Sequence, residues 1–450
     1  MANVKGRQVS RRSFVRLAAG TAALGPFSRL AVGAFTSQKT LKIAKWNHFV
    51  PEFDTWFEQT ARDWGEQHDT KITVDEIPVE RIGAVATAEV QAGSGHDVFM
   101  FPWPPAEYYQ HAIDHGDIYR SAAFKYGAIP QLAHRSTFNP TNKKYFAFAD
   151  FWVPSPLHFY QDYWGEVGMP LGPVHYFGLR SGGQRLRDKL GIPCGLAFSS
   201  TLEGNVTLHT MLYAIRAWML GGNDNVLFNK NVFANQALKY IQSLYQESGT
   251  PDQLTWGSEG NVQAMLARKT SCSTNAISLL RAAEKKDPRM AGKILLQPPL
   301  LGINGMGVTA LPHVTNCSVV WNFSQNREGA SQFLTDLIDT SRTGYDKSLG
   351  CNFPIYPKTV PNLIVKLSND PHADPPYKYT ALKDALHWTP NLGVPGYASP
   401  AYMEIFNSFL IPKVVQSVLK GERTSEDAAA FAAAEMQRIS DKWKQAAQMG

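Results

Sequence analysis

The sequence predicts an α/β protein that is built of two or three domains and is preceded by an export signal. Strand-like and helix-like patterns alternate along the chain after residue 34, without repeats or low-complexity segments. Removal of the first 34 of the 450 residues leaves 416, which is more than one hydrophobic core usually organises. The chain is 44% hydrophobic and 12% aromatic, enough for large cores and for aromatic residues at a binding surface.

The first elements are predicted to form a βαβ unit. Residues 41–46 and 71–77 are strand-like, and Pro51 between them suits the first position of a helix. Residues 82–92 predict a second helix, and the apolar residues 97–101 predict a third strand, buried on both faces as in a parallel sheet. Apolar residues follow Pro51 at helical spacing, at Phe53, Trp56, Phe57, Ala61 and Trp64.

Later segments continue the alternation of strands and helices. An extended aromatic segment covers residues 145–154, and Thr424 to Asp427 can form a capping box for a C-terminal helix that reaches Lys444. Residues 270–275 and 318–323 are strand-like. Helices are expected at residues 205–220, 234–246, 259–268 and 327–339.

The N-terminus resembles a bacterial twin-arginine export signal. Arg11 and Arg12 are followed by Ser and Phe, and then by an Ala/Gly-rich segment, residues 17–24, which is shorter than the ~20 residues that span a bilayer. Small residues at positions 32–34 suggest cleavage after Ala34. We therefore expect export by the twin-arginine translocase to the periplasm; the alternative is a disordered basic N-terminus that contains an Arg pair by chance.

The positive charge of the chain belongs to this leader. The formal net charge is +6, and residues 1–34 hold six basic residues and no acidic one. Taking these six from the 44 Lys and Arg residues leaves 38, which equals the number of Asp and Glu residues. Nucleic acid and anionic membrane both require a clustered positive field, so neither is expected as a partner.

Four cysteines are spread widely, with no C-x-x-C and no His partner at metal-ligand spacing, so no metal site is expected. In an oxidising periplasm they allow one or two disulfides in three pairings, and buried free thiols are the alternative. No cysteine lies at the start of the exported chain, so we infer no lipid anchor. The four residues are Cys194, Cys272, Cys317 and Cys351.

Four stretches resemble, in order and spacing, the family 1 extracellular solute-binding proteins of ABC importers, the maltose-binding type. The family patterns are G-x-x-x-D-V, then G-x-x-A-M before a strand with Asn, then S-x-N-x-x-x-A-x-x-F-L, and finally V-L-x-G before (S/T)-x-E-x-A. The residues after Asn275 lack the aromatic that sugar binders of this family often carry. The matching stretches are Gly93–Val98, Asn261–Met265 with Asn275, Ser324–Leu334, and Val418–Ala428.

This resemblance implies the two-lobe periplasmic-binding-protein fold, type II, with a hinge and a ligand cleft between the lobes. The first lobe would comprise residues 35–149 and 312–352, and the second lobe residues 150–311 and 353–450. The family's function implies a monomer that closes around a sugar or polyol and delivers it to an ABC permease in the inner membrane. No cofactor, no metal and no enzymatic activity are implied.

Candidate ligand-binding residues follow from where loops meet in such a fold. The carboxyl ends of the first and third strands carry Trp46, Asn47 and Trp103, and ligands of open α/β sheets bind beyond these ends. A sugar offers CH faces for stacking on aromatic rings and hydroxyls for polar side chains. The hinge and second lobe add Trp152, Trp256 and Asn275, with Trp388 and Tyr397 as further candidates.

Two alternatives remain at this point. A charged solute could be an anion held by Arg81, Arg180 or Arg281, or a cation held by Glu259 or Asp150. A secreted glycoside hydrolase is the other alternative, because its pair of carboxylates leaves no motif. Other enzyme classes find no support, since the chain has no G-x-S-x-G, no H-E-x-x-H, no Walker loop and no dinucleotide fingerprint.

Overall fold

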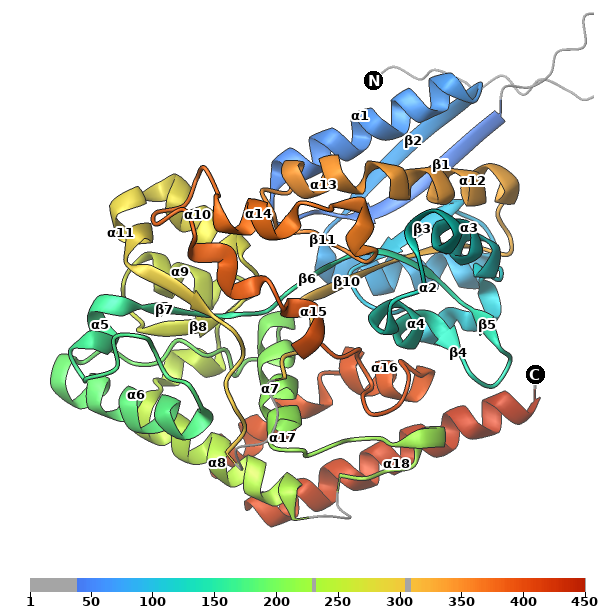
Figure 1. Ribbon diagram of the computed structural model, residues 1–450. Helices are drawn as coiled ribbons and strands as arrows, with labels where there is room; N and C mark the ends of the chain where they lie inside the picture. Colours follow the sequence, from blue (N-terminus) through green and yellow to red (C-terminus); the bar gives the residue numbers. More distant parts are fainter. Residues whose placement is uncertain (1–38, 229–231, 304–308, 450) are drawn as a thin grey trace, which may run out of the picture. The chain divides into compact units, whose positions relative to one another are not determined.

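A six-stranded mixed sheet, here called the large sheet, combines strands from residues 39–153 with two strands from residues 314–354 (Figure 1). The computed structural model describes residues 39–228, 232–303 and 309–449, so the expected export signal with Arg11 and Arg12 lies outside the described residues. The chain from Lys39 onward forms one compact unit. Its strands, in the order β11-β6-β10-β3-β1-β2, are Phe353–Pro354, Phe148–Val153, Val314–Val320, Val98–Phe101, Lys39–Trp46 and Thr70–Ile77.

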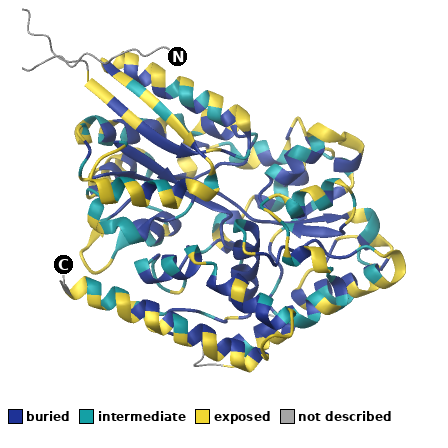
Figure 2. Ribbon diagram, turned by 180° about the vertical axis from the view of Figure 1, so that it is seen from behind, coloured by how far each residue is buried: buried dark blue, intermediate teal, exposed yellow. Residues whose placement is uncertain are grey.

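The predicted βαβ unit is confirmed. Strands β1 and β2 pair in parallel from Lys39 opposite Thr70, and helix α1 (Pro51–Gln67) with Pro at its start connects them. Helix α2 (Ile82–Ala92) ends where Gly93 takes a left-handed conformation, with φ of 60°. Figure 2 shows that buried strands of the large sheet lie beneath helices whose outer faces are exposed. The predicted apolar stripe of α1 buries Phe53, Phe57, Ala61 and Trp64.

Two of the recognised sequence stretches meet in this sheet. Asp97, next to β3, accepts hydrogen bonds from the Lys42 backbone N–H at 2.8 Å and from the Ser324 hydroxyl at 2.7 Å. Two residues further on, the Asn326 side chain caps helix α12 (Arg327–Leu337) by accepting from the Gly329 N–H at 3.0 Å. The spacing of these polar residues therefore reflects one hydrogen-bonded corner that fixes α12 against β1 and β3.

A second, three-stranded antiparallel sheet, the small sheet, has the order β8-β7-β9. Its strands are Cys272–Thr274, Leu157–Tyr160 and Ile294–Gln297. Helices between β7 and β9 in the chain include α5 (Gln161–Gly165), α6 (Tyr176–Leu190), α8 (Phe233–Ser248), α9 (Gly260–Leu266), α10 (Ser278–Lys286) and α11 (Pro288–Gly292).

The chain passes from the large sheet to the small one between β6 and β7, through residues 154–156. The lobe boundary expected at residues 149 and 150 falls inside β6, and the one expected at residues 352 and 353 falls directly before β11. The exact lobe boundaries stay a prediction.

The remaining elements are mostly short helices and turns outside the two sheets, and two of them test predicted helix ends. Helix α7 ends at Ala214 rather than near residue 220, because Arg216 adopts a positive φ of 64° that stops the helix. The C-terminal helix was expected to start at a Thr424 cap, and the Thr424 hydroxyl does accept from the Asp427 N–H at 3.1 Å. These elements are η1 (Val79–Arg81), η2 (Ala106–His111), α3 (Gly116–Tyr126), α4 (Gln131–Thr137), β4 (Phe138–Asn139), β5 (Lys144–Tyr145), α7 (Leu202–Ala214), η3 (Gly222–Asp224), η4 (Pro251–Leu254), η5 (Ile338–Thr340), α13 (Ser341–Lys347), η6 (Pro357–Thr359), α14 (Leu363–Ser368), η7 (Lys378–Leu382), α15 (Ala385–Trp388), α16 (Pro400–Asn407), α17 (Leu410–Leu419) and α18 (Ser425–Met449).

Within the described part of the chain, no helix combines the length and the apolar character needed to cross a bilayer. Among the same residues, no group of three or more His, Cys, Asp or Glu side chains is placed to hold a metal ion. All four cysteines are buried and carry free thiols.

Candidate functional site: a cleft between the two sheets

A cavity of about 1080 Å³ opens between the loops of the large sheet on one side and helices α7, α9, α10 and α16 on the other. The large sheet contributes the segments that follow β1, β2 and β3, including Asn47, Glu80 and Trp103. This placement fits the rule that ligands bind beyond the carboxyl ends of strands in α/β sheets. The opposite wall comes from the starts of α7, α9 and α10 and from the turn between α16 and α17.

Three of the residues predicted from the sequence line this cavity, namely Asn47, Trp103 and Asn275. Trp103 is half-buried, and its ring meets Phe406 edge-on with centroids 6.1 Å apart. Asn275 is 3% exposed and is held by the Asn261 side chain at 3.3 Å. These residues come from the two sides of the cavity, so the structure brings together side chains that the sequence separates by more than 170 positions.

Trp256 lies beside the cavity rather than in its wall. The three residues after it, Gly257, Ser258 and Glu259, line the cavity. Trp256 itself packs against Gly260, where an added Cβ would lie only 2.4 Å from the Trp256 Cβ. The tryptophan therefore fixes the start of α9, and its neighbours face the cleft.

The other four predicted residues lie elsewhere, and their assignment to the cleft wall is corrected. Trp46, the last residue of β1, points into the core, where its ring N–H donates to the Asn316 side chain at 2.8 Å. Trp152, in β6, is 1% exposed and packs on Phe353 of the neighbouring strand β11. Trp388 is buried in α15. Tyr397 packs against the aromatic rings of His134 and Phe138.

Glu203 is a cleft residue that the sequence did not single out. It lies in the first turn of α7, whose N-cap Thr201 accepts a hydrogen bond from the Gly204 N–H at 3.3 Å. Gly204 is required there, because a Cβ at this position would lie 2.0 Å from the Ser199 carbonyl oxygen. An acidic residue in a first helical turn is common, so only the burial of Glu203, 7% exposed, distinguishes it.

Two glutamates that line the cleft have raised pKa values. Burial raises the pKa of Glu203 from 4.5 to about 8, and the negative charges of Glu80 and Glu259 add to this effect. Burial also raises the pKa of Glu107, on η2, to about 7. His313 lies with its Nε2 atom 4.0 Å from Glu203, and burial lowers the pKa of His313 to about 4, so this neighbour is neutral at pH 7.

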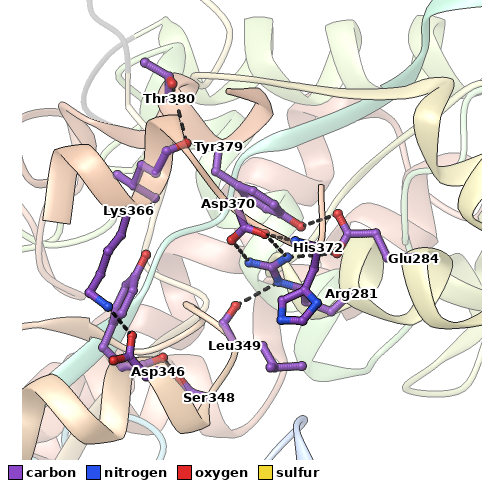
Figure 3. Close-up of polar contacts among 12 residues, drawn as sticks. Arg281, Glu284, Asp346, Ser348, Leu349, Lys366, Asp370, His372, Tyr379 and Thr380 are labelled. Carbon is purple, nitrogen blue, oxygen red and sulfur yellow. Dashed lines mark hydrogen bonds and ion pairs between the residues drawn. The ribbon is translucent and has the colours of Figure 1, made fainter. Parts of the chain in front are cut away.

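The arginines proposed for an anion do not line the cavity. Arg281, on α10, lies between Asp370 and Glu284, with its Nη1 atom 3.0 Å from Asp370 Oδ1 and 2.8 Å from Glu284 Oε2 (Figure 3). Arg180 pairs with Glu247 on the surface. Arg81 lies in a separate shallow pocket beside α2. The structure thus removes the basis for the anion alternative.

Of the two carboxylates proposed for a cation, only Glu259 lines the cavity. Asp150 is buried in β6, where its Oδ1 atom accepts from Asn316 at 2.7 Å. Burial raises the pKa of Asp150 to about 6. Asp150 therefore belongs to the core beneath the cleft.

Solved structures with the same fold are solute-binding proteins. A putative oligosaccharide periplasmic-binding protein from Synechococcus sp. MITs9220 has a TM-score of 0.76 at 15% identity, covering 89% of this chain and 99% of its own. Maltose-bound MalE3 of T. maritima has a TM-score of 0.71 at 17% identity, with 89% and 99% covered. The chain has the two-lobe fold of the maltose-binding type.

A third structure with the maltose-binding fold is a sugar transporter protein from Arthrobacter chlorophenolicus A6 with bound laminaribiose. Its TM-score is 0.73 at 12% identity, and the match covers 89% of this chain and 99% of the other. No family model and no curated protein matches the sequence. The comparison of structures thereby confirms the expected fold. The sequence identities to these structures are between 12% and 17%.

The pKa of Glu203 leads to a prediction about stability. Between pH 4.5 and about 8 the folded carboxyl keeps a proton that the unfolded carboxyl releases, so the stability of the protein falls as pH rises through this window. Glu203→Gln removes this contribution. We expect the free energy of unfolding of the variant, relative to the parent, to rise from pH 5 to pH 8.5 in urea titrations.

The matched control is Glu58→Gln on α1, an exposed residue paired with Arg62, for which the difference from the parent should stay flat. If the parent and Glu203→Gln gave parallel stability curves over this pH range, the buried proton on Glu203 would be refuted.

Proposed function

We propose that the protein is the periplasmic solute-binding component of an ABC importer. It captures a sugar, polyol or related small solute in the cleft and delivers it to a membrane permease, acting as a monomer without a cofactor. The observation that carries this proposal is the cavity of about 1080 Å³, walled by Trp103 and by polar side chains from the loops and helices on both of its sides. The likeness in fold to proteins solved with maltose and with laminaribiose supports it.

Solute capture in this proposal works by closure of the two lobes. The strands and connections between the large and small sheets serve as the hinge, and the solute binds more tightly to the closed arrangement. Ser258, beside α9, donates a hydrogen bond to Glu80, beyond β2, at 3.0 Å. This contact already joins the two sides of the cleft.

A thermal-shift screen of sugars, polyols, amines and phosphates tests the proposal. A solute at about 100 times its Kd adds ~2.7 kcal/mol to the free energy of unfolding, a clear rise in Tm. Binding of a sugar, polyol or amine without turnover would support solute capture. Hydrolysis of a glycoside in the same panel would contradict it in favour of the glycosidase alternative.

Export by the twin-arginine translocase is part of the same proposal. Replacement of both Arg11 and Arg12 by Lys is expected to leave the precursor in the cytoplasm, because the translocase reads the arginine pair. Cell fractionation followed by immunoblotting measures this, with Arg7→Lys as the control outside the pair. Normal periplasmic accumulation of the double variant would contradict this route.

A further inference from the structure

The described lining of the cleft carries acidic side chains and neither lysine nor arginine. Among the described residues that line it, four are glutamates and none is Lys or Arg. None of the four forms an ion pair with a Lys or Arg in the described structure; the charged or polar partner of each is a serine, an asparagine, a glutamine or the neutral His313. The glutamates are Glu80, Glu107, Glu203 and Glu259. A cation beside these carboxyls favours their charged form, so the proton that burial holds on Glu203 would be released as a positively charged occupant binds.

Buried oxygen atoms beside the cavity also lack donors. The carboxylate atoms Glu203 Oε2 and Glu107 Oε2 are buried and have no hydrogen-bond partner within the described residues. The side-chain exposure of Glu203 is 8%, so this carboxyl is more than nine-tenths buried while the residue lines the cavity. Leaving such a group unpaired is unfavourable, more so when it is charged, and a donor on the occupant would offset this cost.

Two asparagines extend this set of acceptors. The Asn205 side-chain N–H donates to the Phe406 carbonyl at 2.8 Å, and the Asn407 side-chain N–H donates to Glu107 at 2.8 Å. These bonds use the side-chain N–H of each amide. Both amide oxygens are buried and accept no hydrogen bond in the described structure. The wall near α7 and α16 thus offers hydrogen-bond acceptors in excess of donors.

We propose that the solute carries at least one protonated amine, which binds against Glu203 with Glu80 and Glu259 nearby. This inference rests on the proposed function, because it names the class of solute that the cleft captures. An alkylammonium group supplies both the positive charge and the several N–H donors that these acceptors lack. The aromatic side chains of the wall suit the same group, because a cation is attracted to the face of an aromatic ring. They are Phe49, Phe101, Trp103, Tyr108, Phe406 and Phe409.

A metal ion does not fit these observations. A cation such as Ca²⁺ requires six or more converging oxygen ligands, and Zn²⁺ requires about four ligands in a tetrahedron. Within the described residues, no three His, Cys, Asp or Glu side chains converge in that way. The glutamates instead spread along a cavity of about 1080 Å³, which has room for an organic cation.

Calorimetric titration of the full exported chain tests the proposal with matched probes. Glucosamine oligomers and their N-acetylated counterparts differ in the charge of the amine, spermidine provides an amine without a sugar, and CaCl₂ provides a cation without N–H donors. We expect an amine probe to bind at least tenfold more tightly than the N-acetylated oligomers and CaCl₂, and its affinity to fall as NaCl is raised from 0.05 to 0.5 M. Preference between the oligomers and spermidine identifies the source of the amine.

Glu203→Gln should weaken binding of that amine at least tenfold, Glu80→Gln should weaken it in the same direction, and Glu58→Gln on α1 should leave it unchanged. Circular dichroism shows whether each variant is folded. If neutral oligomers bound as tightly as the amines, or if both cleft variants kept full affinity, the amine would be excluded while solute capture stood. If no member of the wider solute screen bound, both the amine and the proposed function would be contradicted.

Discussion

Replacement of Arg281 by Met is expected to lower the free energy of unfolding by about 3–5 kcal/mol. The Arg281 side chain is 6% exposed, and it neutralises Asp370 and Glu284, whose side chains are 12% and 8% exposed. Its Nε atom also donates to the Leu349 carbonyl at 2.8 Å, and its guanidinium lies 4.2 Å from the centre of the Tyr379 ring. Met preserves the volume of the side chain but leaves two buried carboxylates without a counter-charge (Figure 3).

The matched control is Arg180→Met. Arg180 forms an ion pair with Glu247 in which the side chains are 36% and 27% exposed, and such pairs contribute about 0–1 kcal/mol. Urea titration of both variants at pH 7 measures the difference. A loss for Arg281→Met no larger than that for Arg180→Met would show that the buried cluster does not hold α10 to the segments around Leu349 and Asp370.

Replacement of Trp103 by Ala is expected to weaken binding of the captured solute at least tenfold while leaving the fold intact. Trp103 follows β3 and is the one tryptophan among the described residues that line the cleft. Truncation of an aromatic anchor in a well-packed site typically costs 2 kcal/mol or more, whether a sugar face or an ammonium group lies on the ring.

Trp218→Ala provides the control for this experiment, because Trp218 is also half-buried but packs on Tyr213 away from the cleft. Calorimetry with the solute found in the screen measures both variants. Equal affinity of the parent and Trp103→Ala for the solute would show that the solute does not bind at the loop that follows β3.

The fold could be predicted from sequence because its opening elements are encoded locally. Pro51 starts α1, its apolar residues recur at helical spacing, and Gly93 ends α2, so each boundary depends on nearby residues. The late stretch around Ser324 was recognisable because its polar residues hold Asp97 and cap α12. The end of α7 could not be found in this way, since the left-handed Arg216 has no glycine or proline signal.

The site could be predicted only in part. Asn47 and Trp103 were found because the ends of parallel strands share one edge of a sheet. Trp46 and Trp152, the second of which was proposed from the hinge, could not be placed correctly in this way. The ring N–H of Trp46 is bonded to Asn316 in the core, and every residue of β6, including Trp152, is buried. Glu203 and His313 are 110 positions apart, and only folding places them 4.0 Å from each other.

The most direct test of solute capture is a crystal structure of residues 35–450 with the solute identified by thermal shift. We predict that the solute occupies the cavity between the two sheets, with a ring or ammonium group on Trp103 and a hydrogen bond to Glu203. A solute bound at another surface, with the cavity between Trp103 and Glu203 still empty at saturating concentration, would contradict the account.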